Sequence, residues 1–297
     1  MNLRTGDNIF RYPTMAEMRH YGPEHCRQMI KNSDVIVFHS AVRPFIDALN
    51  LTDEMLKDKK AVVYFHGSEL RGLGRVLLDQ ADTLLNKAQI VVSTPDLFYH
   101  APDAKWLPVC RSFSEITRRY GICNQDEAAK QSFGVPKQNV VFTHAPSSEF
   151  KKGSTTFYRV ITKLIKELPY VNYLTIQNQP WRTCLHLMSQ VDVHLGQDPP
   201  FTPGPYGQID VEASIYKIPT ITKLASYTIQ KIKELTGRNN PFIIFQDEED
   251  LYMKTYRLAT EPKLRQMFGK LAYKYCKAVH DEKPVVDRFL QIIEEMD

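Results

Sequence analysis

Residues 191–222 of the chain are VDVHLGQDPPFTPGPYGQIDVEASIYKIPTIT, and this stretch decides the fold. Its two ends, 191–195 and 218–222, are short apolar runs rich in β-branched residues, the pattern of buried strands. Between them, a loop rich in glycine and proline leads into a helix that we expect to begin near Tyr206 or Gly207. A strand, a helix and a second strand in this order are typical of a parallel sheet covered by helices.

The same alternation runs through most of the chain. Apolar runs of the same kind predict further strands at 34–39, 60–66, 89–93, 139–143, 171–176 and 241–245. Segments whose apolar residues have the spacing of a helix lie between most of these strands. One example is the stretch 154–168, where one face carries Phe157, Val160, Ile161, Leu164 and Leu168. The sequence therefore predicts an α/β protein of two Rossmann-like domains.

The domain boundary is expected where this alternation weakens, between about residues 110 and 138. We predict a short N-terminal domain over 1–137 and a C-terminal domain over 138–297, each close to the usual ~150 residues. The final amphipathic helix, 283–296, either packs back onto the first domain or caps the second. A ligand is expected between the domains, at the carboxyl ends of the strands.

The composition excludes several classes of protein. Hydrophobic residues make up 43% and charged residues 24%, and the net charge is +4, so neither a disordered chain nor a nucleic-acid partner is indicated. No apolar run is long enough to span a bilayer, and no signal peptide opens the chain, so we expect a cytoplasmic protein and leave peripheral membrane attachment open. The five scattered cysteines indicate neither a disulfide framework nor a zinc site.

Three segments place polar or small residues directly after a predicted strand. In the first, VVYFHGSELRG, His66 ends the strand and Gly67 permits a close backbone approach. A histidine there contacts a substrate or moves a proton, or is simply hydrogen-bonded to a neighbouring loop. His39 ends the preceding strand, so two imidazoles are expected to face the same site, which favours a function.

The second segment, VVFTHAPSSEFKKGSTTFYRV, carries Ser147, Lys151 and Lys152 ahead of a helix that Ser154 or Thr155 would cap. A lysine beside a helix N-terminus suits a phosphate or diphosphate. The alternative is a pair of solvated lysines. The spacing of a P-loop is absent.

The third segment is the one quoted first. Gly204 and Gly207 let a ligand approach the main chain. Glu212 shares a helix face with Ile209, Ala213 and Tyr216, so we expect its carboxylate to point inward. Ribose hydroxyls would satisfy such a carboxylate; the alternative is a half-exposed residue at the edge of the apolar stripe.

Five stretches in this order resemble a known family: HGSELR, VVSTPDL, APDAKWLPV, HAPSSEFKKGS and GPYGQIDVEASIYKIPTI. The chain is similar to GT-B glycosyltransferases, and specifically to retaining glycosyltransferase family 4, over about residues 34–225. The last stretch is the most specific. The resemblance implies two Rossmann-like domains, a nucleotide-sugar donor held mainly by the second, and no metal requirement.

The resemblance also assigns roles by position. Glu212 matches the glutamate that binds the ribose, Lys152 the lysine that meets the diphosphate, and His66 the histidine near the transferred sugar. These three are the expected catalytic residues. The expected donor-binding residues are Ser147, Lys151, Gly204, Tyr206, Gly207 and Gln208.

The chain departs from the family pattern at two positions. Gly204 stands where the family often has a glutamate, eight residues before Glu212. Glu149 stands where a basic residue usually precedes the lysine by three, which reverses the charge beside the expected diphosphate. Either Lys151 substitutes for that residue, or donor binding is weak.

We therefore expect an enzyme that transfers a sugar from a nucleoside diphosphate sugar to an unknown hydroxyl, with retention, without a metal and without a cofactor. No Asp-x-Asp motif occurs, which argues against a metal-dependent transferase of the other common fold. A nucleotide-sugar epimerase and a non-catalytic sugar-nucleotide-binding subunit remain as alternatives.

Overall fold

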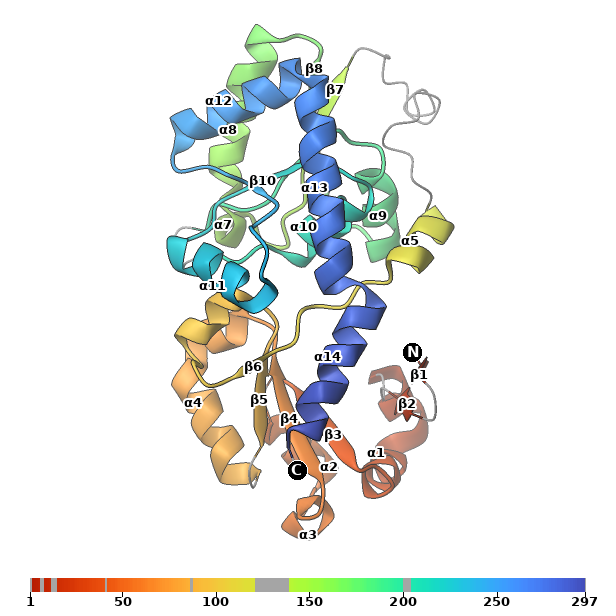
Figure 1. Ribbon diagram of the computed structural model, residues 1–297. Helices are drawn as coiled ribbons and strands as arrows, with labels where there is room; N and C mark the ends of the chain where they lie inside the picture. Colours follow the sequence, from red (N-terminus) through yellow and green to blue (C-terminus); the bar gives the residue numbers. More distant parts are fainter. Residues whose placement is uncertain are drawn as a thin grey trace. The chain divides into compact units, whose positions relative to one another are not determined.

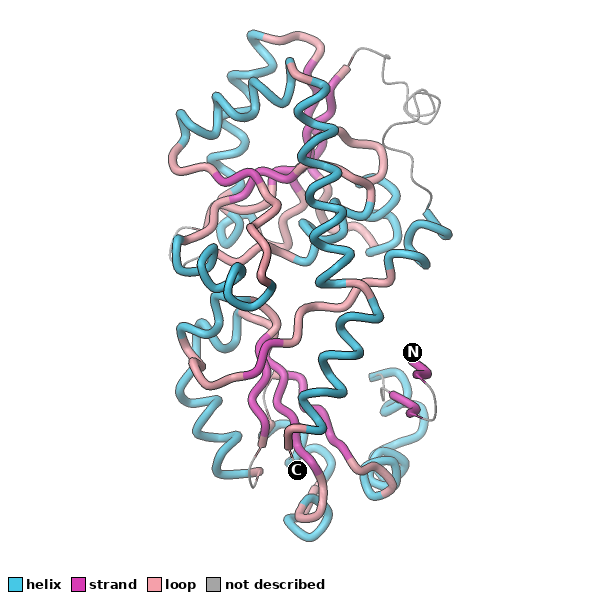
Figure 2. The backbone as a smooth tube through the Cα atoms, viewed as in Figure 1, coloured by secondary structure: helices cyan, strands magenta, loops and turns pink. Residues whose placement is uncertain are grey.

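The structure, a computed structural model, describes residues 2–5, 8–11, 15–40, 42–85, 88–120, 139–199 and 204–296. It divides into two compact units. Unit 1 comprises residues 1–93, 97–106 and 291–297, and unit 2 comprises 94–96 and 107–290. Figure 2 shows the strands of each unit gathered into a sheet of their own, with helices around it.

The predicted boundary between 137 and 138 lies outside the described residues. Among those residues, the chain passes from unit 1 to unit 2 between Trp106 and Leu107. The segment after this point is tied to unit 2, because the Arg111 amide donates to the His280 carbonyl over 2.8 Å and the Phe113 amide donates to Asp281 Oδ1 over 3.1 Å.

Unit 1 is built on a four-stranded parallel sheet in the order β3-β4-β5-β6. The order follows the chain, so each strand is added beside the previous one. An antiparallel pair, β1 and β2, precedes this sheet. Up to β6 the elements in Figure 1 are β1 (Asn2–Thr5), β2 (Asn8–Arg11), α1 (Met15–Lys31), β3 (Val35–His39), α2 (Arg43–Leu49), α3 (Asp53–Leu56), β4 (Lys60–Phe65), α4 (Ser68–Leu84), β5 (Gln89–Val92), a 3-10 turn (Pro95–Tyr99) and β6 (Lys105–Trp106).

Unit 2 is built on a five-stranded parallel sheet in the order β11-β10-β9-β7-β8. Its strands are β7 (Val140–His144), β8 (Val171–Thr175), β9 (Val193–Leu195), β10 (Thr220–Thr222) and β11 (Ile243–Ile244). Its helices are α5 (Phe113–Tyr120), α7 (Glu149–Lys152), α8 (Ser154–Glu167), α9 (Trp181–Met188), α10 (Gln208–Ile215), α11 (Ser226–Thr236), α12 (Glu248–Thr260), α13 (Pro262–His280) and α14 (Glu282–Glu294), the last of which ends in unit 1.

The strand order of unit 2 reverses at its first strand. β7 has β8 on one side and β9 on the other. The chain therefore forms β8 on one side of β7 and then crosses to the other side to form β9. In open parallel sheets, ligands bind outside the carboxyl ends of the strands at such a switch point. The loops that follow β7 and β9 therefore come together where a ligand is expected.

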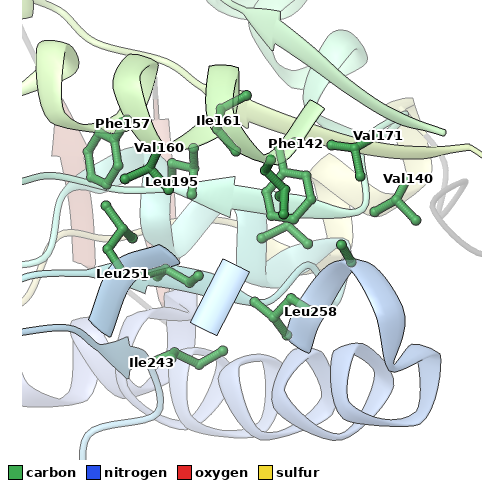
Figure 3. Close-up of a cluster of buried hydrophobic side chains, with 14 of the residues drawn as sticks. Val140, Phe142, Phe157, Val160, Ile161, Val171, Leu195, Ile243, Leu251 and Leu258 are labelled. Atoms are coloured by element: carbon green, nitrogen blue, oxygen red, sulfur yellow. The ribbon is translucent and has the colours of Figure 1, made fainter. Parts of the chain in front are cut away.

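One face of this sheet is packed against α8 and α12. Phe157, Ile161 and Leu164 of α8 are at most 1% exposed, and Leu251 and Leu258 of α12 are buried with them. Figure 3 shows Phe157, Ile161, Leu251 and Leu258 gathered with side chains of the strands, among them Leu195. The apolar spacing that predicted this helix thus corresponds to its buried face, and this packing holds β7 and its following loop in place.

The eight strands predicted from the sequence are all present, within two residues at each end. The structure adds β1, β2 and β6, the last only two residues long, too short to stand out as an apolar run. The predicted cap of α8 is wrong: Gly153 occupies the cap position, and Ser154 Oγ is instead 2.9 Å from His144 Nε2. None of the described helices is both long and apolar enough to cross a membrane.

Candidate functional site

The loop after β7 brings Lys152 to the loop after β9. Ser148 caps the short helix α7 by accepting from the Lys151 amide, and Gly153, with φ of 65°, turns the chain into α8. A Cβ on Gly153 would lie 2.1 Å from the Asp198 carbonyl oxygen, so the two loops can meet only at a glycine. The Asp198 amide donates to the Lys152 carbonyl over 3.0 Å, which joins the two loops.

The Lys152 ammonium lies beside the beginning of α10. Its Nζ donates to Gln197 Oε1 over 2.5 Å, and a Cβ on Gly207 would be 3.8 Å from the same nitrogen. Gly207 precedes the first residue of α10, where the sequence placed the beginning of this helix. A positive charge and the amides of a helix N-terminus thus face the same place, an arrangement suited to an anion.

The buried carboxylate of Asp210 stabilises the beginning of α10. Asp210 accepts from the Gly207 amide over 2.6 Å through Oδ2, and its Oδ1 lies 3.0 Å from His194 Nε2. Asp210 and His194 are at most 1% exposed. The hydrogen bond from the Gly207 amide to Asp210 holds the turn and fixes the backbone that approaches Lys152.

Glu212 is 3% exposed, so its predicted burial is confirmed, although the whole stretch from Asp210 to Tyr216 is buried and not one face of the helix alone. Its Oε1 accepts from Arg111 Nε over 2.7 Å and from Trp181 Nε1 over 2.9 Å. Arg111 Nη2 also donates to Gln208 Oε1 over 2.6 Å. The carboxylate thus has protein partners that the sequence did not suggest. Arg111 and Trp181 lie 101 and 31 residues away along the chain, and no local pattern marks them.

The other predicted donor-binding residues are placed differently from one another. Ser147 is exposed on the loop after β7, and Lys151 is exposed in α7. Gly204 is buried, and a Cβ there would lie 2.8 Å from the Lys223 carbonyl. The Tyr206 side chain is 3% exposed, and its hydroxyl bonds to His280 Nε2 over 3.0 Å, so it offers the ligand only its backbone.

Glu149, the residue of reversed charge, is exposed in the first turn of α7. Burial raises the pKa of Tyr173 on β8, and the charge of Glu149 adds to that rise. Glu149 is thus close enough to β8 to act on Tyr173, whereas Lys152 contacts Gln197, which follows β9.

His66 lies in unit 1, at the end of β4, and faces His39 at the end of β3. Its Nε2 is 2.7 Å from His39 Nδ1, and the two rings are within 7° of parallel. Burial lowers the pKa of both imidazoles, that of His39 to about 4. Glu69 orders the loop by accepting from the His66 amide over 2.6 Å. The two histidines lie together at neighbouring strand ends, and the ligand site that they were expected to face stays a prediction.

In the part of the chain that the structure describes, no three histidine, cysteine, aspartate or glutamate residues are grouped so that they could hold a metal ion.

The fold is shared with several solved structures. No family model and no curated protein sequence matches the chain. The N-terminal domain of trehalose-6-phosphate phosphatase from Candida albicans matches with a TM-score of 0.63 and 11% identity, over 99% of this chain and 78% of that one.

Two further structures match with slightly lower TM-scores. HepE from Anabaena, in complex with UDP-glucose, gives a TM-score of 0.60 and 15% identity, over 92% of this chain and 81% of that one. A glycosyltransferase from Rickettsia africae gives 0.60 and 12%, over 97% and 83%. The chain therefore has the GT-B fold of two Rossmann-like units, as the sequence predicted.

Proposed function

We propose that this protein is a glycosyltransferase that moves a sugar from a nucleoside diphosphate sugar to a hydroxyl acceptor. The observation that carries the proposal is the position of Lys152. Its ammonium lies at the switch point of unit 2, bonded to Gln197 and beside the first turn of α10. A fold shared with a glycosyltransferase, and with a protein solved in complex with UDP-glucose, supports the same donor class. Fold alone does not fix chemistry, so the proposal rests on the site.

The proposed chemistry is stabilisation of a leaving group. As the bond between the sugar and the diphosphate breaks, negative charge grows on the diphosphate oxygen. Lys152 and the free amides of the first turn of α10 would meet that charge where it develops, and so lower the barrier. No cofactor takes part in this proposal.

The remaining residues have proposed roles around this centre. Glu212 would bind the ribose through its carboxylate, and the backbone at Gly204, Tyr206 and Gly207 would line the loop below the diphosphate. Gln208, Ser147 and Lys151 would complete the donor site, and His66 would contact the transferred sugar. Retention and independence from metal belong to the proposal through the resemblance of the motifs alone.

The first experiment screens donors. Titrations with UDP, GDP, ADP and TDP are followed by assays of the corresponding nucleotide sugars. Thermal stability should rise with at least one diphosphate, since a ligand that binds only the folded state stabilises it. Release of the nucleotide, increased by an acceptor, supports a transferase. An epimerised donor indicates an epimerase, and binding without turnover of any donor indicates a binding subunit.

Lys152→Ala tests the site. The substitution should weaken binding of the diphosphate by about 1–3 kcal/mol and leave binding of the matching nucleoside nearly unchanged, because the lost contact is to phosphate. Isothermal calorimetry measures both. Lys166→Ala is the matched control, since Lys166 is an exposed lysine of α8. Equal losses for the diphosphate and the nucleoside would contradict a diphosphate role for Lys152.

A further inference from the structure

The guanidinium of Arg111 lies along the first turn of α10. It donates from Nη2 to Gln208 Oε1 over 2.6 Å and from Nε to Glu212 Oε1 over 2.7 Å. Gln208 and Glu212 are four residues apart, so both face the same planar group. The side chains of Arg111 and Glu212 are only 19% and 4% exposed. A positive charge is thereby fixed at the beginning of the helix.

The backbone around Arg111 is held from both sides. The Val109 carbonyl accepts from His280 Nδ1 over 2.9 Å, and the Arg111 amide donates to the His280 carbonyl over 2.8 Å. The Phe113 amide donates to Asp281 over 3.1 Å. All of these residues belong to unit 2. The contacts with the end of α13 therefore fix the backbone position from which the Arg111 side chain reaches α10.

The charges beside α10 bear on whether a diphosphate can bind there. Lys152 is one positive group beside α10, but Glu149 stands where the resemblance expects a second, and it is exposed in α7. Glu212 would by itself repel a diphosphate bound close to it. Arg111 offsets the charge of Glu212, and it brings its N–H donors to the same turn as Lys152.

Arg111 also has donors left for a ligand. A guanidinium has five N–H groups. Its contacts with the described residues use three: Nε to Glu212, Nη2 to Gln208, and Nη1 to the Cys110 carbonyl over 2.8 Å. One N–H remains on each terminal nitrogen, a pair that matches two oxygens of a phosphoryl group.

We infer that Arg111 is a donor-binding residue: its guanidinium offsets the charge of Glu212 and offers the diphosphate a second set of N–H donors at α10, beside Lys152. The inference rests on the proposed function and adds a residue from outside the recognised motifs. It also explains how a site with Glu149 at the usual basic position can hold a diphosphate.

The test compares the affinity of the protein for a nucleoside diphosphate and for the matching nucleoside. The probes are UDP, GDP, ADP and TDP, with uridine, guanosine, adenosine and thymidine. Arg111→Gln should reduce the preference for the diphosphate roughly tenfold or more, the loss expected for a charged hydrogen bond. Arg111→Lys should retain part of the preference. Arg118→Gln, at an exposed arginine of α5, is the matched control and should retain all of it.

A second pair of variants separates binding from folding, because Arg111→Gln leaves the buried Glu212 carboxylate without its cation. Glu212→Gln removes that carboxylate, and the double variant Arg111→Gln with Glu212→Gln leaves no unpaired charge. The phosphate preference should be lower in the double variant than in Glu212→Gln alone. An equal preference in the two would show that Arg111 acts only through Glu212, and would overturn the inference.

The outcomes for the inference and for the proposed function are distinct. If the wild-type protein binds a diphosphate and Arg111→Gln keeps the full preference, the inference fails while the proposed function stands. If the wild-type protein binds none of the four diphosphates, the proposed function fails and the inference with it.

Discussion

Two buried histidines, His144 and His280, are each held in one tautomer by the groups around them. His280 Nδ1 is 2.9 Å from the Val109 carbonyl, which can only accept, so this nitrogen carries the proton and Nε2 accepts from the Tyr206 hydroxyl. By the same reasoning, His144 donates from Nδ1 to the Leu195 carbonyl over 2.7 Å. Burial lowers the pKa of His39, His144 and His280 to about 4. The folded protein therefore keeps these rings neutral.

This predicts a loss of stability in mild acid. The unfolded chain binds protons on these histidines near pH 6.5, whereas the folded chain does so only near pH 4. The free energy of unfolding should therefore fall as the pH is lowered from about 6.5 toward 4, which urea titrations at several pH values would measure. His280→Gln should flatten the dependence, and His186→Gln, at an exposed position, should not. A dependence unchanged in both variants would contradict this account.

Single residues also show what a sequence can reveal about a site. The burial of Glu212 was predicted, but spacing on one helix face does not account for it, because every residue from Asp210 to Tyr216 is buried. Its partners were not predicted. Arg111 reaches Glu212 through the fixing of its backbone by the end of α13, a contact between distant parts of the chain. The burial of Tyr206 against His280 was not predicted either, because the two residues are 74 positions apart in the chain.

At the scale of elements, the connection from α7 to α8 determines where Lys152 lies. Gly153 and Gly237 both adopt φ of 65°, but they differ in their surroundings. A Cβ on Gly153 would meet the Asp198 carbonyl at 2.1 Å, whereas a Cβ on Gly237 would have nothing within 4 Å. An alanine at Gly237 would therefore have only the cost of the backbone conformation, whereas an alanine at Gly153 would have that cost and a steric clash as well.

Gly153→Ala should lower the free energy of unfolding by more than Gly237→Ala does. Each substitution carries the left-handed penalty of about 1–2 kcal/mol, and Gly153→Ala adds a clash of roughly 1–3 kcal/mol. Urea unfolding of the two variants measures the difference. Equal costs would mean that the loops after β7 and β9 are not in contact at this glycine.

The elements themselves were largely predictable. Apolar runs and helical spacing gave the strands of both sheets and the buried face of α8, because each signal lies within one segment. The missed elements are β6, with two residues, and the antiparallel pair β1 and β2. The order β11-β10-β9-β7-β8, which brings the loops of Lys152 and Gln197 together, depends on how strands pair, and no single segment carries that information.

At the scale of the molecule, unit 1 is assembled from distant parts of the chain. Residues 291–297 belong to it, although all of 107–290 lies in unit 2. Lys60 Nζ donates to the Ile293 carbonyl over 3.0 Å, and Lys105 pairs with Glu295 at 2.7 Å. Ile292, between these contacts, is 4% exposed. The stability of unit 1 thus depends on a segment that follows unit 2.

Ile292→Ala should destabilise unit 1 selectively. Removing this buried side chain should lower the free energy of unfolding of unit 1 by about 2–4 kcal/mol. Amide hydrogen exchange would show faster exchange in β3 to β6 and little change in β7 to β11. Glu294→Ala, at an exposed position two residues on, is the control. Equal acceleration in both sheets, or none in either, would contradict the prediction.

The return of the chain to unit 1 has a consequence for biosynthesis. The ribosome synthesises residues 107–290 before residues 291–297. All of unit 2 is therefore synthesised before the last segment of unit 1. Vectorial folding should therefore complete the later unit first. During translation, the apolar surface of unit 1 that Ile292 covers in the folded protein would stay exposed. A chaperone would bind this surface until residues 291–297 are in place.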